Sequence, residues 1–114
     1  MQGKKKPSMT DAQVEEAARL FAILSEPSRL KLLRALMTGP LTVTELVEAS
    51  EMKQGNVSKH LGVLLQARFV AREREGNFAR YAIADDRLFT LCELMCARIA
   101  DDARRRLTAL AEGV

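Results

Sequence analysis

The stretch from Leu41 to Ile83 most constrains the fold, because its apolar periodicity changes within a short distance. Up to about Ala67, apolar residues recur every three or four positions, as in helices. After Phe69-Val70 the period becomes two, and Glu75-Gly76-Asn77 supplies residues that favour a tight hairpin turn. The predicted order is a short helix, a turn, a longer helix and a hairpin, which is a helix-turn-helix followed by a wing.

The two helices of this unit have recognisable limits. Thr42 and Glu45 form a capping box that begins the short helix, which continues through Ala49. Ser50-Glu51-Met52 forms the turn, and the second helix runs from Lys53 or Gln54 to about Ala67. On a helical wheel its predicted inward residues are Val57, Leu61, Leu64 and Leu65, its outward residues are Gly55, Ser58, Lys59, Gly62 and Gln66, and Asn56 and His60 lie on the flanks.

Helices are also predicted on both sides of the unit. A first helix is capped by Thr10 with Gln13 and ends near Ser25, which can cap a second helix that Gly39-Pro40 stops. A last helix follows a cap at Asp85 and continues to about Ala111. Its apolar stripe comprises Leu88, Leu91, Cys92, Met95, Cys96 and Ile99, and in so small a domain it suggests a partner surface, most simply a second copy.

The whole chain therefore reads as mainly α with a small β-hairpin: a winged helix-turn-helix of about five helices and a two-stranded wing. Its 114 residues suit one domain, predicted over residues 10–112, with a disordered basic arm over residues 1–9. No apolar run is long enough to span a membrane and no secretory signal is recognisable. Two cysteines are too few for a disulfide framework, so we expect a cytoplasmic protein.

Positive charge is concentrated on the predicted helix-turn-helix and wing. Residues 53–81 contain six Lys or Arg and two Glu, a net charge of +4, which leaves −1 for the rest of a chain of net charge +3. This distribution is typical of a nucleic-acid-binding surface. The outer helix face carries small and hydrogen-bonding side chains, which can lie close against a groove.

Three ordered motifs resemble those of the ArsR (arsenic-repressor-like) winged-helix regulators. LSEPSRLKLL at 24–33 is similar to the family's opening motif, and QGNVSKHL at 54–61 to its recognition-helix signature. Arg74-Glu75-Gly76 followed by Tyr81-Ala82-Ile83 resembles its wing, although Asn77 stands where the family often has a basic residue. The resemblance implies a homodimer, held by the first and last helices, that binds a two-fold symmetric double-stranded DNA operator and represses transcription until an inducer acts.

The expected DNA contacts come from the recognition helix and the wing. The N-terminal part of such a helix approaches base edges in the major groove, while wing arginines reach phosphates or the minor groove. The candidate residues are Gln54, Asn56, Ser58, Lys59 and His60 on the helix and Arg72, Arg74 and Arg80 on the wing. For His60 we expect a role at the DNA backbone.

The signal that the protein senses is less clearly encoded. The cysteine pair that some family members carry after Leu41 is absent, and no histidine follows position 60 for a last-helix zinc or nickel site. Cys92 and Cys96 remain, one helical turn apart. They could bind a soft metal or trivalent metalloid, with a third ligand from elsewhere, or be oxidised, or simply pack as small apolar side chains. A member without an inducer site would regulate by DNA binding alone.

Two function classes other than a DNA-binding regulator are alternatives for this chain. A winged helix can serve as a protein-interaction module whose basic face binds an acidic protein. The polar, small-residue outer face of the recognition helix favours DNA instead. An enzyme is not expected, because the single histidine lies on the predicted DNA face and neither a catalytic triad nor a glycine-rich phosphate loop can be assembled.

Overall fold

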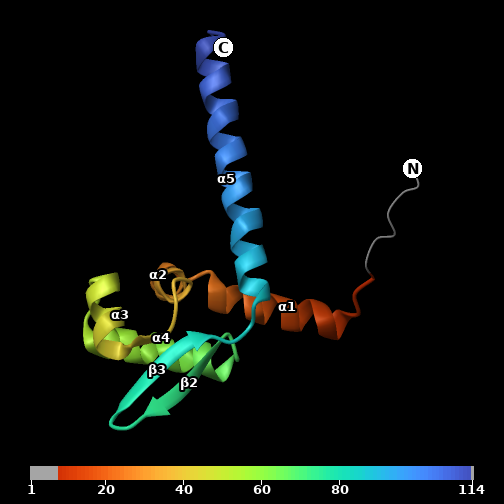
Figure 1. Cartoon of the computed structure of the whole chain (residues 1–114). Helices are drawn as coiled ribbons and strands as arrows, with labels where there is room; N and C mark the ends of the chain where they lie inside the picture. The colour runs from red at the N-terminus through yellow and green to blue at the C-terminus, as the bar shows by residue number, and fades with distance from the viewer. Residues whose placement is uncertain (1–7, 114) are drawn as a thin grey trace.

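The computed structural model describes residues 8–113 and contains five helices and three strands (Figure 1). The helices are α1 (Asp11–Leu24), α2 (Pro27–Leu36), α3 (Val43–Ser50), α4 (Gln54–Gln66) and α5 (Arg87–Ala111). The strands are β1 (Leu41–Thr42), β2 (Val70–Glu75) and β3 (Phe78–Ile83). This confirms the predicted winged helix-turn-helix. Most of the predicted arm, residues 1–7, lies outside the described residues.

Both predicted capping boxes are present, and they explain where α1 and α3 begin. The Gln13 backbone N–H donates to Thr10 Oγ1 at 3.1 Å, and the Gln13 side chain accepts from the Thr10 N–H at 3.0 Å. Thr42 and Glu45 repeat the arrangement at 3.2 Å and 2.8 Å. Each box satisfies two backbone donors that a helix start otherwise leaves unpaired.

The predicted cap of the second helix is wrong by one residue. Glu26 caps α2, because its carboxylate accepts the Ser28 backbone N–H at 2.5 Å. Ser25 instead has a helical backbone conformation and closes α1, with its hydroxyl donating to the Ala22 carbonyl at 2.9 Å. A residue that still has helical dihedral angles cannot serve as the extended N-cap of the next helix.

The hairpin has the predicted position and gains a third strand. β2 and β3 pair antiparallel from Val70 opposite Ile83 to the turn, where Gly76 has a φ of 59° that suits glycine. The short strand β1 adds to the free edge of β3, with Leu41 opposite Tyr81, so the sheet order is β1-β3-β2. Two residues are too few to show an alternating pattern, which is why the sequence did not predict β1.

The core lies between α2, α3, α4 and the base of the sheet. It consists of Leu32, Leu33, Leu36, Leu46, Val57, Leu61, Leu64, Phe69, Val70, Tyr81 and Leu88. Three of the four residues predicted to face inward on α4 belong to it, and the fourth, Leu65, is half-buried. The recognition helix is therefore fixed by aliphatic packing along one side only.

Helices α1 and α5 contribute little to this core. Within residues 8–113, no residue of α1 is buried, and Leu88 is the only buried residue of α5. Figure 1 shows α5 rising away from the other elements and α1 extending to one side. The radius of gyration is 18.1 Å, against about 13 Å for a compact chain of about 100 residues. No helix in the described part is long and apolar enough to cross a membrane.

Candidate nucleic-acid interface

Helix α4 presents a polar outer face, as the sequence predicts. Gln54, Asn56, Ser58 and Lys59 are all exposed, while Val57 between them is fully buried. The N-cap residue Lys53 makes no side-chain cap hydrogen bond, so backbone N–H groups of the first turn remain available to an acceptor. Together with the positive end of the helix dipole, they favour an anion at this end of α4.

Two glycines, Gly55 and Gly62, leave the outer face of α4 without a side chain at two positions. A β-carbon at Gly55 or Gly62 would meet nothing within 4 Å, so packing inside this chain does not require glycine at either position. Glycine within a helix costs roughly 1 kcal/mol relative to alanine. The two positions are seven residues apart and both exposed. Their arrangement fits close approach by another molecule, such as the DNA backbone.

His60 is placed differently from its exposed neighbours on α4. It is half-buried, and its Nδ1 lies 3.2 Å from Nη1 of Arg29 on α2. Part of its ring is therefore occupied by a contact within the protein. Sequence reasoning did not single out Arg29, because the contact joins residues 31 positions apart.

The three wing arginines are divided between the two faces of the sheet. Side chains alternate along a strand, so Arg72 and Arg74 share a face with the buried Val70. Arg80 pairs with Glu73 across the hairpin and therefore lies on the opposite face. Arg72 and Arg74 are exposed, whereas Arg80 is half-buried. One face of the wing thus carries the exposed Arg72 and Arg74, and the opposite face carries Arg80 together with Glu73.

Arg80 is held by carboxylates from two elements. Its Nε donates to Glu75 Oε1 at 2.7 Å, and its Nη1 lies 3.8 Å from Glu45 Oε1 at the start of α3. The Thr42 backbone N–H lowers the pKa of the Glu45 carboxyl, and Arg80 lowers it further by its charge. Arg80 therefore ties the wing to the helix-turn-helix, a role that the sequence prediction of a DNA contact did not include.

The two cysteines lie on α5, outside α4 and the wing. Cys92 is half-buried and Cys96 is exposed, and both are free thiols. Burial raises the pKa of the Cys92 thiol, and the neighbouring Cys96 raises it further. Within residues 8–113, no three His, Cys, Asp or Glu side chains cluster as a metal site would require.

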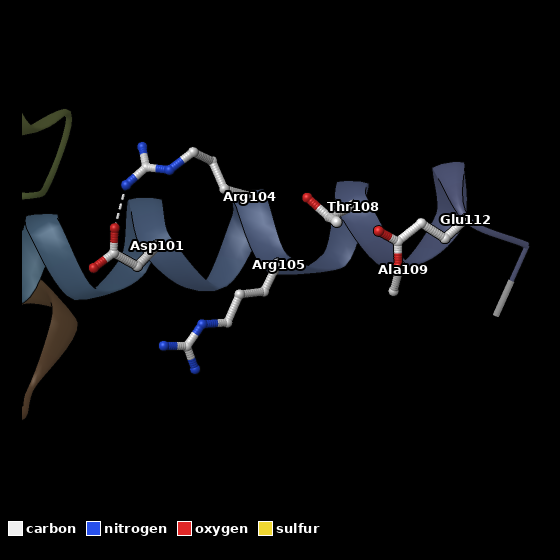
Figure 2. Close-up of a pocket in the computed structure, with 6 residues that line it drawn as sticks. All are labelled: Asp101, Arg104, Arg105, Thr108, Ala109 and Glu112. Carbon is white, nitrogen blue, oxygen red and sulfur yellow. Dashed lines mark hydrogen bonds and ion pairs between the residues drawn. The ribbon is translucent and has the colours of Figure 1, made fainter.

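A shallow hollow near the end of α5 does not form a binding site. Figure 2 shows its six lining residues, Asp101, Arg104, Arg105, Thr108 and Ala109 on successive turns of α5 and Glu112 at the C-cap of the same helix. Asp101 and Arg104 pair with each other. A hollow lined by one helix has no opposing wall, so it cannot enclose a ligand.

Two helices joined by a tight turn, with an exposed polar second helix and a basic hairpin beside it, define a winged helix-turn-helix DNA-binding protein. The profile described as "Bacterial regulatory protein, arsR family" matches residues 26–72. The chain belongs to this family and is a DNA-binding transcriptional regulator.

Several of its relatives are named as repressors. A probable mercury resistance operon repressor of Streptomyces lividans is 37% identical over 89 residues, covering 78% of this chain and 71% of the relative. Among solved structures, the AntR antimony-specific transcriptional repressor superposes with a TM-score of 0.77 at 33% identity, covering 89% of this chain and 92% of that chain. A homodimeric winged helix-turn-helix domain from Mycobacterium bovis gives 0.70 at 26% identity, covering 85% and 95%.

Proposed function

We propose that this regulator represses transcription in the cytoplasm as a homodimer bound to a roughly two-fold symmetric operator. The observation that carries the proposal is the outer face of α4, which is polar, exposed and lowered by two glycines. In this proposal Gln54, Asn56, Ser58 and Lys59 enter the major groove, with Arg72 and Arg74 on flanking phosphates or in the minor groove. Arg80 contributes less, because carboxylates of the protein already engage it, and His60 has one ring nitrogen engaged by Arg29 and the other available to DNA.

The proposed dimer is supported by apolar side chains that α1 and α5 leave exposed. Phe21 on α1 is 61% exposed, and Ile99 on α5 is 61% exposed. The same property is shared by Val14, Leu94, Met95, Leu107 and Leu110. Exposed apolar side chains on two helices that project from the core are typical of a surface that a second copy covers. A two-fold dimer would present two α4 helices to successive major grooves, about 34 Å apart.

A soft metal ion or trivalent metalloid bound by Cys92 and Cys96 is the proposed signal. Two thiolates one turn apart on one helix suit thiophilic ions, and relatives are named for mercury and antimony. Because α5 is part of the proposed dimer surface, a bound ion would change how the two recognition helices are held relative to each other.

The experiment is a DNA-binding titration by fluorescence anisotropy, using a duplex from upstream of the protein's own coding sequence. The signal is tested by adding mercuric ion or trivalent antimony to the wild type and to the Cys92→Ser, Cys96→Ser double variant, with a phosphine reductant present. We expect the wild type to release the duplex and the variant to stay bound. If the wild type keeps its affinity for the duplex in the presence of mercuric ion and also in the presence of antimony, the cysteines do not have the sensing role. A double variant that fails to fold would assign the cysteines to packing.

A further inference from the structure

Arg29 bridges two helices that have different tasks in the proposed function. Its Nε donates to the Ile23 backbone carbonyl at 2.7 Å, in the last turn of α1. In a continuous helix that carbonyl would accept the N–H of residue 27, which is Pro27 and has no N–H. The Arg29 guanidinium replaces the missing donor and ties α2 to the end of α1.

The other end of the same guanidinium reaches the recognition helix. Nη1 lies 3.2 Å from Nδ1 of His60 on α4. Arginine has only donors and stays protonated in proteins, so Nδ1 must accept this hydrogen bond. An imidazole that accepts at Nδ1 carries its proton on Nε2. The contact therefore selects one tautomer of His60.

The free edge of the imidazole remains available for a further contact. Within residues 8–113, no hydrogen bond to His60 Nε2 is formed, and no buried side-chain nitrogen or oxygen lacks a partner. Nε2 therefore retains contact with solvent and can donate to an external acceptor. Glu26 is a charged group close to this pair. The Ser28 N–H lowers the pKa of its carboxyl, and the charge of Arg29 lowers it further.

We propose that Arg29 is a positioning residue that couples the end of α1 to the recognition helix by fixing His60 as its Nε2–H tautomer. This inference rests on the proposed function, in which α1 forms the dimer and α4 reads the DNA. His60 then offers one fixed N–H donor to a DNA phosphate or base acceptor. A shift of the Ile23 carbonyl relative to α2 moves the guanidinium, and the imidazole loses its orientation.

The tautomer can be read directly, because His60 is the only histidine in the chain. A long-range ¹H–¹⁵N spectrum of untagged, ¹⁵N-labelled protein shows which ring nitrogen carries the proton. We expect the Nε2–H form in the wild type and a mixture of both forms in Arg29→Met. Arg34→Met removes a cation from the exposed side of the same helix and should leave the spectrum unchanged. An Nδ1–H wild type, or an Arg29→Met spectrum identical to the wild type, would overturn the assignment.

The Arg29→Lys variant tests whether the positive charge or the planar shape of the guanidinium fixes the tautomer. It also provides the test if Arg29→Met fails to fold. A single ammonium keeps the cation but lacks the planar fork that bonds two acceptors in different directions. We expect this variant to show both tautomers as well. A wild-type tautomer in Arg29→Lys would mean that a cation alone suffices, which contradicts the bridging role.

Duplex binding then tests the functional consequence. Loss of one oriented hydrogen bond should weaken binding by about 5-fold in Arg29→Met and to a similar extent in His60→Ala. The double variant should bind no more than about 2-fold more weakly than either single variant, because both remove the same contact. If the fold-change in the double variant equals the product of the two single fold-changes, the coupling between Arg29 and His60 is contradicted. A wild type without duplex affinity would refute the proposed function, while the tautomer would still test the bridge.

Discussion

The Nε of Arg80 lies 2.7 Å from Glu75 Oε1, so one of the three wing arginines is paired within the wing itself. Arg80 also shares its face of the sheet with Glu73, opposite to the face of Arg72 and Arg74. Its charge is therefore partly neutralised before any DNA arrives. The electrostatic contribution of the wing to DNA binding is concentrated on Arg72 and Arg74.

Removing the Glu75 carboxylate should break the shorter of the two ion pairs of Arg80 and strengthen DNA binding. An exposed ion pair is worth at most about 1 kcal/mol, so we expect Glu75→Gln to raise affinity by about 3-fold at low salt. Glu73→Gln removes the same charge from the same strand without breaking the bond to Arg80 and serves as the control. Equal effects of the two substitutions in an anisotropy titration would show that Arg80 gains nothing by release.

Phe21 on α1 offers a direct test of the dimer. Burying a phenylalanine contributes about 1.5–3 kcal/mol, and two-fold symmetry counts it twice, so Phe21→Asp should weaken self-association at least about 100-fold. Phe78 at the wing tip is similarly exposed, at 68%, and is not part of the proposed dimer surface. Phe78→Asp should therefore leave the molar mass measured by light scattering unchanged. If the Phe21→Asp variant is still a dimer, the dimer interface does not include this face of α1.

Gly62→Ala should separate stability from DNA binding. Alanine is favoured over glycine in a helix by about 1 kcal/mol, and a β-carbon here meets nothing within 4 Å, so urea denaturation should show a more stable protein. The added methyl group protrudes from the outer face of α4 and prevents the closest approach of the DNA, so duplex affinity should fall several-fold. A variant that is more stable and binds DNA as well as the wild type would mean that Gly62 does not lie at the closest approach.

The cap at Glu26 predicts a pH-dependent contribution to stability. The Ser28 N–H holds the pKa of the Glu26 carboxyl below its ordinary value of 4.5. Because the pKa is lower in the folded state, the stabilisation is present above about 4.5 and is lost as the pH falls through the folded value. Glu26→Gln should therefore lower the Tm by roughly a few degrees at neutral pH, with the difference closing in acid. Glu48→Gln, on the exposed side of α3, is the charge-matched control; a difference that persists in acid would point to lost packing instead.

Local patterns predicted most of the fold. Capping boxes at Thr10 and Thr42 involve residues three positions apart, and the wheel of α4 depends on its own periodicity, so both are visible in one sequence. Where two signals competed, the prediction failed: Ser25 and Glu26 are adjacent and both can cap, and only the path of the chain decides between them. The strand β1 depends on pairing with residues about 40 positions away.

The candidate site was predictable as a surface and less so as individual contacts. Exposure of Ser58 and Lys59 follows from the wheel, which places Asn56 on the flank. The engagement of His60 by Arg29 and of Arg80 by Glu45 joins elements that are distant in sequence, and periodicity contains no information about such pairs. Residue type indicated a basic wing, whereas strand register decides which arginines share a face.

The central claim is that α4 and one face of the wing bind DNA electrostatically and specifically. The most direct measurement is an anisotropy titration of the upstream duplex and a scrambled duplex over a range of salt concentrations, with wild type, Lys59→Ala and Arg74→Ala. We predict preference for the upstream duplex, two protomers per site, weaker binding by each folded variant, and a log–log salt slope reduced by about 0.9 for each phosphate contact removed. Equal binding of both duplexes, or unchanged affinity and slope in both variants, would contradict this account.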